Sequence, residues 1–509
     1  MGPGFFFSLS WRRGRSRAVN GAAAAVVLGT LERPRELAEL PKTSAGTEER
    51  DNVMNRSSLS VAALLLAAAP LAAQEVLPIH RTTLDNGLDV IVIENRAVPL
   101  VTIELDVRNG AYTESPEYDG LSHLYEHMFF KANRTIPSQE RYLERVNELG
   151  AIWNGTTSTE RVNYYVTVGV DSLVPAMQFM EDAIRYPLFD QAELERERPV
   201  VLGEYDRGES NPFFHLGRAT DTLLWSPAYY SRKNVIGDRQ VIITTTQEKM
   251  RTIQERFYVP NNSALILSGH IVPERGFALA EEIFGDWPRG GDPFPEPIPG
   301  PPPLTESRAI VVEQPVNTVT VTVKWHGPSV TDDPEATYVA DLLATALANP
   351  TSKFYKALVE SGLAFGVGFS YFTQMHVGPI TIQAQTSPDK ALALHRAILA
   401  EVEKLDDPGY VTAEELDAAK VQVDISQIYQ REQASSFAHT VGFWWAVTGL
   451  DYYLGYVDGL RAVTQDDIAE FARTYMIGKP NVSGVLIDPA SRAEIALTAN
   501  DLLAQEVVQ

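Results

Sequence analysis

Residues Pro288 to Pro303, with the sequence PRGGDPFPEPIPGPPP, divide the chain into two parts. The stretch contains 8 prolines, and proline lacks the N–H group that a helix interior or a central strand requires. We therefore predict a semi-rigid extended linker over residues 288–304. Two segments of similar length flank this linker, residues 74–287 and residues 305–509. We interpret them as two half-domains.

The two segments repeat one order of elements, beginning with a strand. Val101–Val107 (VTIELDV) alternates between apolar and polar residues, as a half-buried strand does, and Val319–Lys324 (VTVTVK) alternates in the same way. In each segment a polar turn and then a helix-like stretch follow. Chance similarity between helix and strand patterns is the alternative explanation, but the agreement continues along most of both segments, which favours a duplication.

The later parts of the two segments also correspond. A helix pattern over Thr246–Phe257 precedes a strand pattern at residues 262–267, and a helix pattern over Thr464–Tyr475 precedes one at residues 482–487. The helix starts differ by 218 residues (464 minus 246) and the strand starts by 220 (482 minus 262). Hairpin-like strand pairs separated by helix pairs predict an α+β fold, in which each half is a mostly antiparallel sheet with helices packed on one face.

Composition and charge exclude several classes of protein. The 509 residues are 44% hydrophobic and 21% charged, as in globular proteins, and the formal charge is −23. Such an acidic chain disfavours nucleic acid as a partner. There are 0 cysteines, which excludes a disulfide framework, a thiol nucleophile and a cysteine zinc site. Beyond residue 80 no apolar run is long enough to span a membrane.

The N-terminal segment has the pattern of an export signal. Arg56 supplies a positive charge after Met54, Val61–Ala69 is a short apolar run, and small residues precede Gln74. We expect a signal peptide at residues 54–73, preceded by a misassigned upstream segment at residues 1–53. The mature chain is then expected to begin at residue 74 and to be exported, with a bacterial periplasm as the location.

The strongest chemical motif is His123-Leu124-Tyr125-Glu126-His127, within a helix predicted over Gly120–Lys131. Residues four apart lie on one face of a helix, so His123 and His127 can direct two imidazoles at one point. Two neutral imidazoles suit zinc, and a further carboxylate would leave the fourth position open for water. Glu126 lies beside them, where it can take a proton from that water. The alternative is a surface helix with two solvated histidines.

A third ligand must come from elsewhere, and the acidic run Glu193–Asp206 (ELERERPVVLGEYD) is the candidate. A run of charges is usually a solvated helix face. Here Val200, Val201 and Leu202 predict that the helix is buried. Within it, Glu197 and Glu204 are seven residues apart and share a face. One could complete the metal site, and the other could orient a ligand or the water.

These residues together resemble the insulinase/pitrilysin family of zinc peptidases, to which the mitochondrial processing peptidases belong. His123-x-x-Glu126-His127 is the inverted zinc motif of the inverzincins, and the resemblance extends over residues 76–509. That family places its third ligand roughly 75 residues further on, where Glu204 stands 77 residues after His127. The resemblance implies that His123, His127 and Glu204 bind one Zn²⁺ per chain. It also implies that Glu126 is the general base and that Glu197 supports the site.

The stretch Gly150–Ser158 (GAIWNGTTS) resembles the family's substrate-binding strand. The resemblance implies that Asn154 contacts the peptide backbone, and Gly155 departs from the alanine common there. The residues by themselves agree, because residues 152–166 contain two β-rich segments. An edge strand there could pair with an extended peptide, although a purely structural hairpin remains an alternative.

The second half carries no matching metal motif. The residues that lie 218 positions after the histidine motif are Asp341–Thr345 (DLLAT). Family members often carry an Arg and a Tyr near a Gly-Leu-Ala-Tyr segment, and the matching stretch is Ser352–Val367 (SKFYKALVESGLAFGV). Phe365 replaces the tyrosine, and Val359 or a neighbour replaces the arginine. Tyr371 or Tyr355 could stand in for the missing hydroxyl.

The residues and the resemblance together predict a zinc-dependent endopeptidase, and the resemblance implies that it hydrolyses short or unfolded peptides inside a closed chamber. Because Phe365 cannot donate a hydrogen bond, we expect a partner: a heterodimer with a zinc-less homologous subunit carrying Arg and Tyr, or a homodimer as second choice. The competing prediction is a non-catalytic subunit that binds peptides or has a structural role. Zinc storage is a third possibility, which a single site with a general base does not favour.

Overall fold

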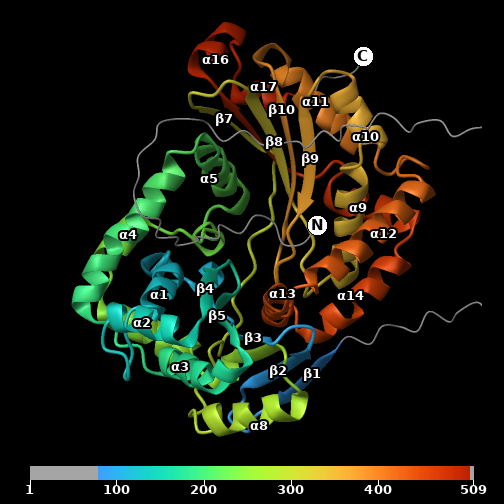
Figure 1. Ribbon diagram of the computed structural model, residues 1–509. Coiled ribbons are helices and arrows are strands. Elements are labelled where there is room, and N and C mark those ends of the chain that lie inside the picture. Colours follow the sequence, from blue (N-terminus) through green and yellow to red (C-terminus); the bar gives the residue numbers. More distant parts are fainter. Residues whose placement is uncertain (1–77, 505–509) are drawn as a thin grey trace, which may run out of the picture. The chain divides into compact units, whose positions relative to one another are not determined.

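The computed structural model describes residues 78–504 (Figure 1). The segments at 1–53 and 54–73, for which an upstream extension and a signal peptide were predicted, lie outside the described residues. The first half contributes six strands: β1 (Ile79–Thr83), β2 (Asp89–Glu94), β3 (Leu100–Val107), β4 (Ile152–Thr157), β5 (Val162–Gly169) and β6 (Ser263–Gly269). The second half contributes five: β7 (Arg308–Glu313), β8 (Val319–His326), β9 (Gly366–Tyr371), β10 (Pro379–Thr386) and β11 (Val482–Ile487).

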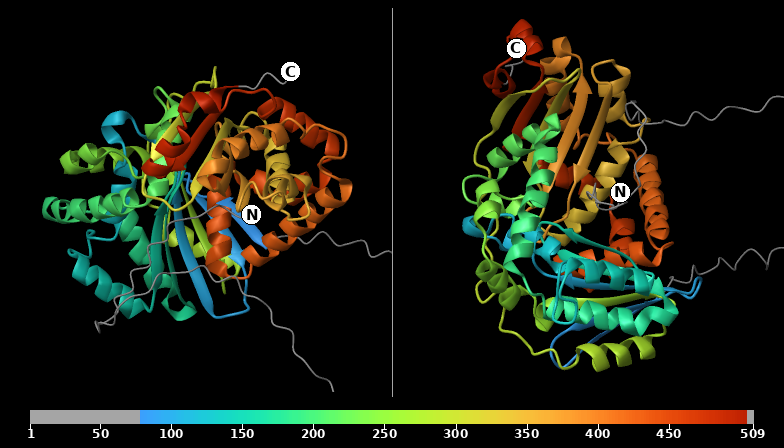
Figure 2. Two further views of the ribbon diagram at one scale, coloured as in Figure 1. Left: turned by 90° about the horizontal axis from the view of Figure 1, so that it is seen from above. Right: turned by 60° about the vertical axis from the view of Figure 1, so that its left-hand side comes forward.

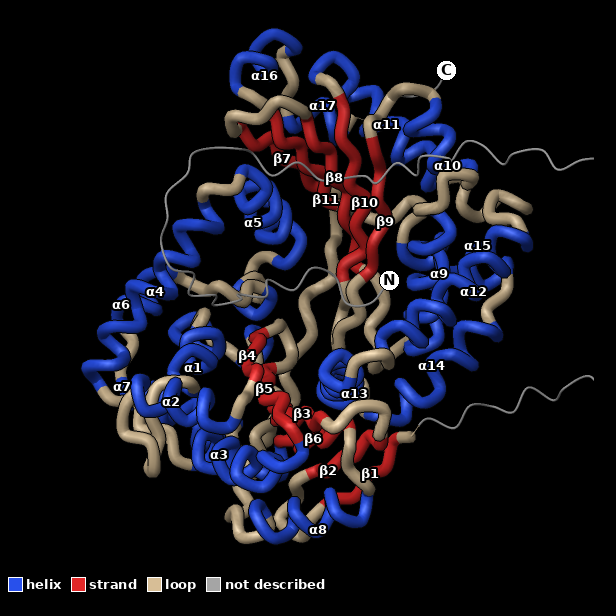
Figure 3. The backbone as a smooth tube through the Cα atoms, in the orientation of Figure 1, coloured by secondary structure: helices blue, strands red, loops and turns tan. Residues whose placement is uncertain are grey.

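Helices lie between these strands in both halves (Figure 3). Those of the first half are α1 (Leu121–Phe129), α2 (Gln139–Leu149), α3 (Leu173–Arg185), α4 (Gln191–Glu209), α5 (Pro212–Trp225), α6 (Arg239–Thr244), α7 (Gln247–Phe257) and α8 (Pro273–Phe284). Those of the second half are α9 (Pro334–Leu347), α10 (Lys353–Tyr355), α11 (Ala391–Val402), α12 (Ala413–Gln430), α13 (Ala434–Val447), α14 (Leu450–Ala462), α15 (Gln465–Tyr475), α16 (Pro489–Ile495) and α17 (Ala499–Leu503).

The two sheets have the same topology. The strand order is β1-β2-β6-β3-β5-β4 in the first sheet and β7-β11-β8-β10-β9 in the second. Each has one parallel pair, β2 with β6 and β7 with β11, and the remaining pairs are antiparallel. Strand β1 is the additional strand of the first half. The predicted fold class, α+β with two homologous half-domains, is confirmed.

The predicted late elements occur in both halves with side-chain caps at their helix starts. Thr246 accepts a hydrogen bond from the backbone of α7, and Thr464 accepts one from α15. Such caps satisfy N–H groups that have no partner inside the helix. Each helix is then followed by a fully buried strand, β6 or β11. The capping threonines explain why the sequence pattern located these helix starts well.

In the first sheet, alternation in β3 separates an apolar face from a polar one. Val101, Ile103 and Leu105 belong to the buried core that includes residues of α3. Glu104 and Asp106 point to the opposite face, yet both are fully buried. A helix from the second half, α13, covers them (Figure 1).

Close packing and polar contacts hold α13 on this face. His439 Nδ1 lies 2.5 Å from Glu104 Oε2. Gly442 lies directly over Asp106, where any side chain would collide with the carboxylate.

The second sheet receives a helix from the first half in return. Helix α5 packs on β11, β7 and β8, on the opposite side of the sheet from α11 (Figures 1 and 2). Lys324 Nζ of β8 lies 2.6 Å from Asp221 Oδ1 of α5, and His326 Nε2 lies 2.9 Å from the Leu224 carbonyl oxygen. The prediction that helices pack on one face of each sheet therefore holds for the helices that belong to the same half as the sheet. An exchanged helix covers part of the other face.

The proline-rich stretch lies between α8 and β7. Residues 288–304 contain no helix or strand in the structure. Arg256 of α7 donates a hydrogen bond from Nε to the carbonyl oxygen of Pro293 at 3.0 Å, which fastens this stretch to the first half. Among residues 78–504, no helix has the length and apolar character needed to cross a membrane.

Candidate metal centre

Helix α1 carries the histidine motif, and a remote carboxylate fixes where it begins. Its N-cap is Gly120, whose φ of 89° is accessible mainly to glycine and whose lack of a side chain leaves the first N–H groups uncapped. Glu114 replaces that cap: its two oxygens accept hydrogen bonds from the backbone N–H groups of Gly120 and Ser122, each at 2.7 Å. Burial raises the pKa of Glu114 to about 8, although these hydrogen bonds oppose the shift.

The structure brings His123, His127 and Glu204 to one point. The Nε2 atoms of His123 and His127 lie 3.5 and 3.6 Å from Glu204 Oε2. Ligands about 2.0–2.1 Å from a tetrahedral zinc are about 3.3–3.4 Å apart, so this spacing fits zinc. No other group of three or more His, Asp or Glu side chains in the described residues has this convergence. The donor set of two imidazoles and one carboxylate is the one expected of catalytic zinc sites.

Helix α4 brings Glu197 and Glu204 against α1. It is 19 residues long, and Asp190 caps it by accepting from the N–H groups of Ala192 and Glu193. Two turns separate the glutamates, so both side chains face α1. The prediction that the valines bury this helix is wrong at one position: Val201 is buried, but Val200 is 40% exposed. A helix can bury only one stripe, and adjacent residues point about 100° apart.

Glu197 contacts the imidazole nitrogen of His127 that faces away from Glu204. His127 Nδ1 lies 2.8 Å from Glu197 Oε1, and Lys131 Nζ lies 2.5 Å from Glu197 Oε2. The contact fixes which imidazole nitrogen faces Glu204, as carboxylates behind zinc-binding histidines do. Burial alone would raise the pKa of Glu197, but the hydrogen bonds with His127 and Lys131 outweigh it and hold the pKa below its usual value.

The two histidines have opposite pKa shifts. Burial lowers the pKa of His123 to about 4, which keeps the imidazole neutral at pH 7. Burial also acts to lower the pKa of His127, but hydrogen bonds with Glu197 and Glu204 outweigh it and raise the pKa to about 10. Only a neutral imidazole can bind a metal, so zinc binding requires His127 to release a proton.

Glu126 lies beside this donor set and contacts strand β4. Thr157 Oγ1 donates a hydrogen bond to Glu126 Oε2 at 2.7 Å. Burial raises the pKa of Glu126 above its ordinary value, and hydrogen bonds from Thr157 act in the opposite direction. A raised carboxyl pKa suits a group that takes a proton near neutral pH.

Within residues 78–504, strand β4 is the last strand of its sheet, so one of its edges has no strand partner there. Asn154 is half-buried and pairs with Tyr165 of β5. Side chains alternate along a strand, and Gly155 and Thr157 face Glu126. Asn154 therefore points to the opposite face from α1. Of the six predicted site residues, the structure brings His123, Glu126, His127, Glu197 and Glu204 together and places Asn154 on this neighbouring edge.

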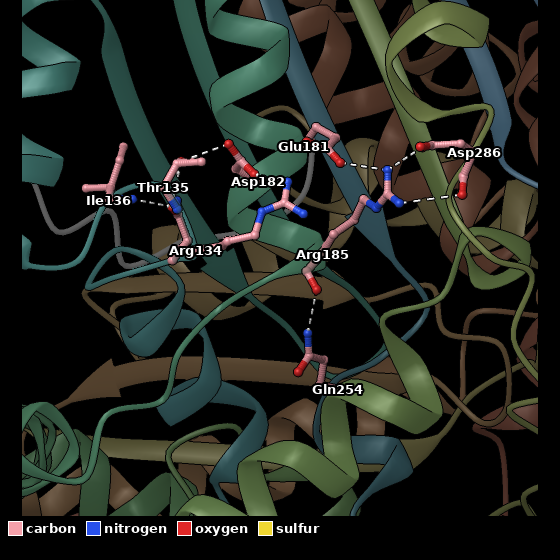
Figure 4. Close-up of polar contacts among 9 residues, drawn as sticks. Arg134, Thr135, Ile136, Glu181, Asp182, Arg185, Gln254 and Asp286 are labelled. Carbon is pink, nitrogen blue, oxygen red and sulfur yellow. Dashed lines mark hydrogen bonds and ion pairs between the residues drawn. The ribbon is translucent and has the colours of Figure 1, made fainter.

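The chain that follows α1 is anchored to α3 (Figure 4). Arg134 Nη2 lies 2.7 Å from Asp182 Oδ1, and Thr135 Oγ1 donates to Asp182 Oδ2 at 2.8 Å. Further along α3, Arg185 contacts Glu181 and Asp286, each at 2.6 Å. The contacts of Arg134 and Thr135 hold the segment that follows α1 against α3, which packs on β3 and β5.

In the second half, Phe365, which stands where the family often has a tyrosine, lies at the surface. Phe365 precedes β9, which is an edge strand of the second sheet in the part of the chain that the structure describes, and Phe365 is 60% exposed. Tyr371 does not offer a free hydroxyl in its place, because it donates to the Pro328 carbonyl oxygen at 3.0 Å. Tyr355 lies in α10 and is half-buried.

Three residues of the site were missed by sequence reasoning: Lys131, Thr157 and Glu114. Lys131 had a detectable signal, because it follows His127 by four residues and so shares its helix face. Thr157 had a weaker one, because strand alternation puts it on the same side as Gly155. For Glu114, which lies in no regular element shared with α1, the sequence offers no periodicity to identify it.

This fold and donor set define a class, the zinc peptidases with an inverted histidine motif, and comparison with known proteins identifies the family. A family model described as Insulinase (Peptidase family M16) matches residues 89–225, and one described as Peptidase M16 inactive domain matches residues 244–423. The chain belongs to the insulinase/pitrilysin family, M16.

Relatives with curated names agree with this assignment. An uncharacterized zinc protease of Rickettsia felis is 25% identical over 375 residues, covering 72% of this chain and 87% of the relative. Zinc protease PqqE of Helicobacter pylori is 25% identical over 398 residues, covering 75% and 86%. Among solved structures, a protease from Helicobacter pylori superposes with a TM-score of 0.73 at 20% identity, covering 81% of this chain and 100% of the other. The family and these names support a zinc peptidase in general terms.

Proposed function

We propose that this chain is a zinc-dependent endopeptidase that hydrolyses short or unfolded peptides. One observation carries the proposal: three ligand atoms of His123, His127 and Glu204 converge with spacing suited to zinc, and Glu126 and an unpaired strand edge lie beside them. A metal ligand set, a base and a peptide-binding edge are the parts that peptide hydrolysis requires.

Each residue has a distinct role in the proposal. When bound, zinc would supply a Lewis acid that polarises the scissile carbonyl and makes water a better nucleophile. His123, His127 and Glu204 hold the metal. Glu126 takes a proton from the attacking water and returns it to the leaving amine. Glu197, held by Lys131, fixes the orientation of His127.

Strand β4 is the proposed peptide-binding element. An extended peptide that adds to its free edge would receive backbone hydrogen bonds along residues 152–157, beside Glu126. We assign Asn154 to this contact. Pairing of this kind selects extended backbone more than side-chain sequence. A folded protein rarely leaves an extended segment free to pair, which favours short or unfolded substrates. We propose that these peptides bind within a closed chamber.

A second subunit would complete the site. Phe365 has no hydroxyl, and the Tyr371 hydroxyl is already bonded to Pro328. A hydrogen-bond donor aimed at the oxyanion is typically worth about 2.7–4 kcal/mol of barrier. We propose that a homologous, zinc-less subunit carrying Arg and Tyr supplies it, with a homodimer as second choice. Sedimentation of the purified protein alone and with candidate partners, with activity measured on the same samples, tests this. Full activity of the isolated chain would contradict a need for the partner.

The decisive experiment is Glu126→Gln, assayed with an unstructured quenched-fluorescent peptide while zinc content is measured on the same samples. We expect wild type, assayed alone and with its partner, to cut the peptide in the complete assembly, and we expect the variant to retain zinc and lose about 10²–10⁴-fold in rate. Turnover that survives the change would show that Glu126 is not the base.

A non-catalytic, peptide-binding subunit is the second candidate, and the exposed Phe365 is the observation that favours it. Zinc bound without cleavage, both alone and with a partner present, would support it. We also propose that the chain is exported, to a bacterial periplasm. N-terminal sequencing of the protein from fractionated cells tests the location and the start of the mature chain together.

A further inference from the structure

Strand β4 contacts the proposed base directly. Thr157, the last residue of β4, donates from Oγ1 to Glu126 Oε2 at 2.7 Å. Thr157 is paired with Val162 of the neighbouring strand β5, so the sheet fixes the position of its backbone. The hydroxyl thereby holds one carboxylate oxygen in place, while both oxygens of the ionised carboxylate keep a lone pair that can accept a proton.

Gly155 limits where the same carboxylate can move. A Cβ atom at this position would lie 3.0 Å from Glu126 Cγ and 3.1 Å from Glu126 Oε1. The backbone of β4 therefore approaches the base more closely than a strand with side chains there would allow. Thr157 bonds the carboxylate from one position of the strand, and Gly155 contacts it from a position two residues earlier.

We propose that Thr157 is a positioning residue that fixes the Glu126 carboxylate for proton transfer, so that the strand that binds the peptide also orients the base. The inference rests on the proposed function and deepens it. A peptide that pairs with β4 would stabilise the strand, and with it the hydrogen bond that orients Glu126. Binding of an extended backbone and readiness of the base are then coupled through one side chain.

Two substitutions separate the hydroxyl from the rest of the side chain. Thr157→Val keeps the β-branched shape and removes the hydroxyl, whereas Thr157→Ser keeps the hydroxyl and removes a methyl group. We expect Thr157→Val to lower kcat by about 10- to 100-fold, as a small misplacement of a catalytic group does. KM and zinc content should change less than twofold. Thr157→Ser should keep at least half of the wild-type kcat.

The matched control is Thr322→Val in β8 of the second sheet. Thr322 is also a strand threonine, although it is fully buried where Thr157 is half-buried, and its hydroxyl has no hydrogen-bond partner within the described residues. We expect its kcat to equal that of wild type. Wild-type kcat in Thr157→Val would overturn the inference, as would equal losses in Thr157→Val and Thr157→Ser. Loss of zinc from Thr157→Val would do so too, because the side chain would then support the metal ligands.

A structural readout separates this inference from the proposed function. Crystal structures of wild type and Thr157→Val, both without peptide, should show the Glu126 carboxylate displaced or in several conformers only in the variant. An unmoved carboxylate overturns the inference even if wild type cuts peptides. If wild type cuts nothing, alone or with a partner present, although zinc is bound, the proposed function fails, and a displaced carboxylate in the variant would still support Thr157 as the residue that holds Glu126.

Discussion

The two halves place a helix after corresponding strands but use it differently. In the first half, α1 follows β3 and presents His123 and His127 to carboxylates of α4, with Glu126 beside them. In the second, α9 follows β8, and its Asp341 accepts a hydrogen bond from the Tyr456 hydroxyl. Both helices bury apolar residues against their sheets. The difference teaches that the fold requires only a helix with an apolar face at this place, and that a few added side chains supply the chemistry.

The largest expected difference between the halves concerns the metal. His123→Ala removes one of three ligands, so we expect zinc to fall from about one per chain to near zero and peptide hydrolysis to disappear. Asp341→Asn, at the position 218 residues later, should change neither. Elemental analysis of the two purified variants measures this directly. Zinc retained by His123→Ala would show that the metal lies elsewhere.

The pKa of His127 is raised to about 10, whereas the pKa of a buried histidine in the second half is lowered. This second contrast should appear in acid. His395 of α11 is fully buried beside Ser483, and burial, assisted by Arg396, lowers its pKa to about 4. The unfolded chain binds this proton near pH 6.5 and the folded chain does not. The contribution of His395 to stability is therefore complete above pH 6.5 and is lost progressively as the pH falls from 6.5 to 4, by about 3 kcal/mol in total.

Urea unfolding of wild type and His395→Gln between pH 7 and 4 tests this sign. The free energy of unfolding of wild type should fall more steeply with acid than that of the variant. Parallel curves would mean that His395 takes up no more protons on unfolding than glutamine does.

An ion pair beside α1 and an ion pair on the second sheet should differ in what they support. Lys131→Met removes the cation that holds Glu197, so we expect zinc affinity to fall by about 10- to 100-fold, as it does when supporting partners of metal ligands are lost. Lys324→Met breaks an ion pair of similar length between β8 and α5 and should leave zinc affinity unchanged. Competition with a chromophoric chelator measures both. Equal affinities in Lys131→Met and wild type would remove Lys131 from the metal centre.

The smallest expected effect comes from a comparison of two glycines, one in the edge strand β4 and one in the edge strand β9. Gly155→Ala brings a Cβ to 3.0 Å from Glu126 and from Phe130, so a small displacement of the base is expected, with a loss of about two- to tenfold in kcat. Gly368→Ala on β9 meets open space and should have no effect. Steady-state kinetics on both variants decide it. An unchanged Gly155→Ala would show that Glu126 tolerates the contact.

Much of this molecule could be predicted from its sequence because local patterns determine it. Alternation identified β3 and β8, the capping threonines located α7 and α15, and the spacing of His123 and His127 predicted their shared helix face. The convergence of Glu204 with the histidines depended on a resemblance, because no local pattern states which distant helix packs on α1.

The helix exchange could not be predicted, for a related reason. Glu104 and Asp106 alternate with apolar residues in β3, and such polar positions usually face water. Here they are buried under α13, where His439 and Arg161 pair with them. A polar strand face indicates that the core lies on the other side, but it does not say whether water or a borrowed helix covers it.

The exchange of α5 and α13 has a consequence for the integrity of the chain. Each half contributes a helix to the other half's sheet, as the subunits of a domain-swapped dimer do. A protease that cut the linker at residues 288–304 would therefore yield a nicked molecule whose fragments stay associated. Either fragment made alone would leave a sheet face uncovered and would need its counterpart for complementation. The covalent link raises the effective concentration of the halves, while the exchanged helices hold them together.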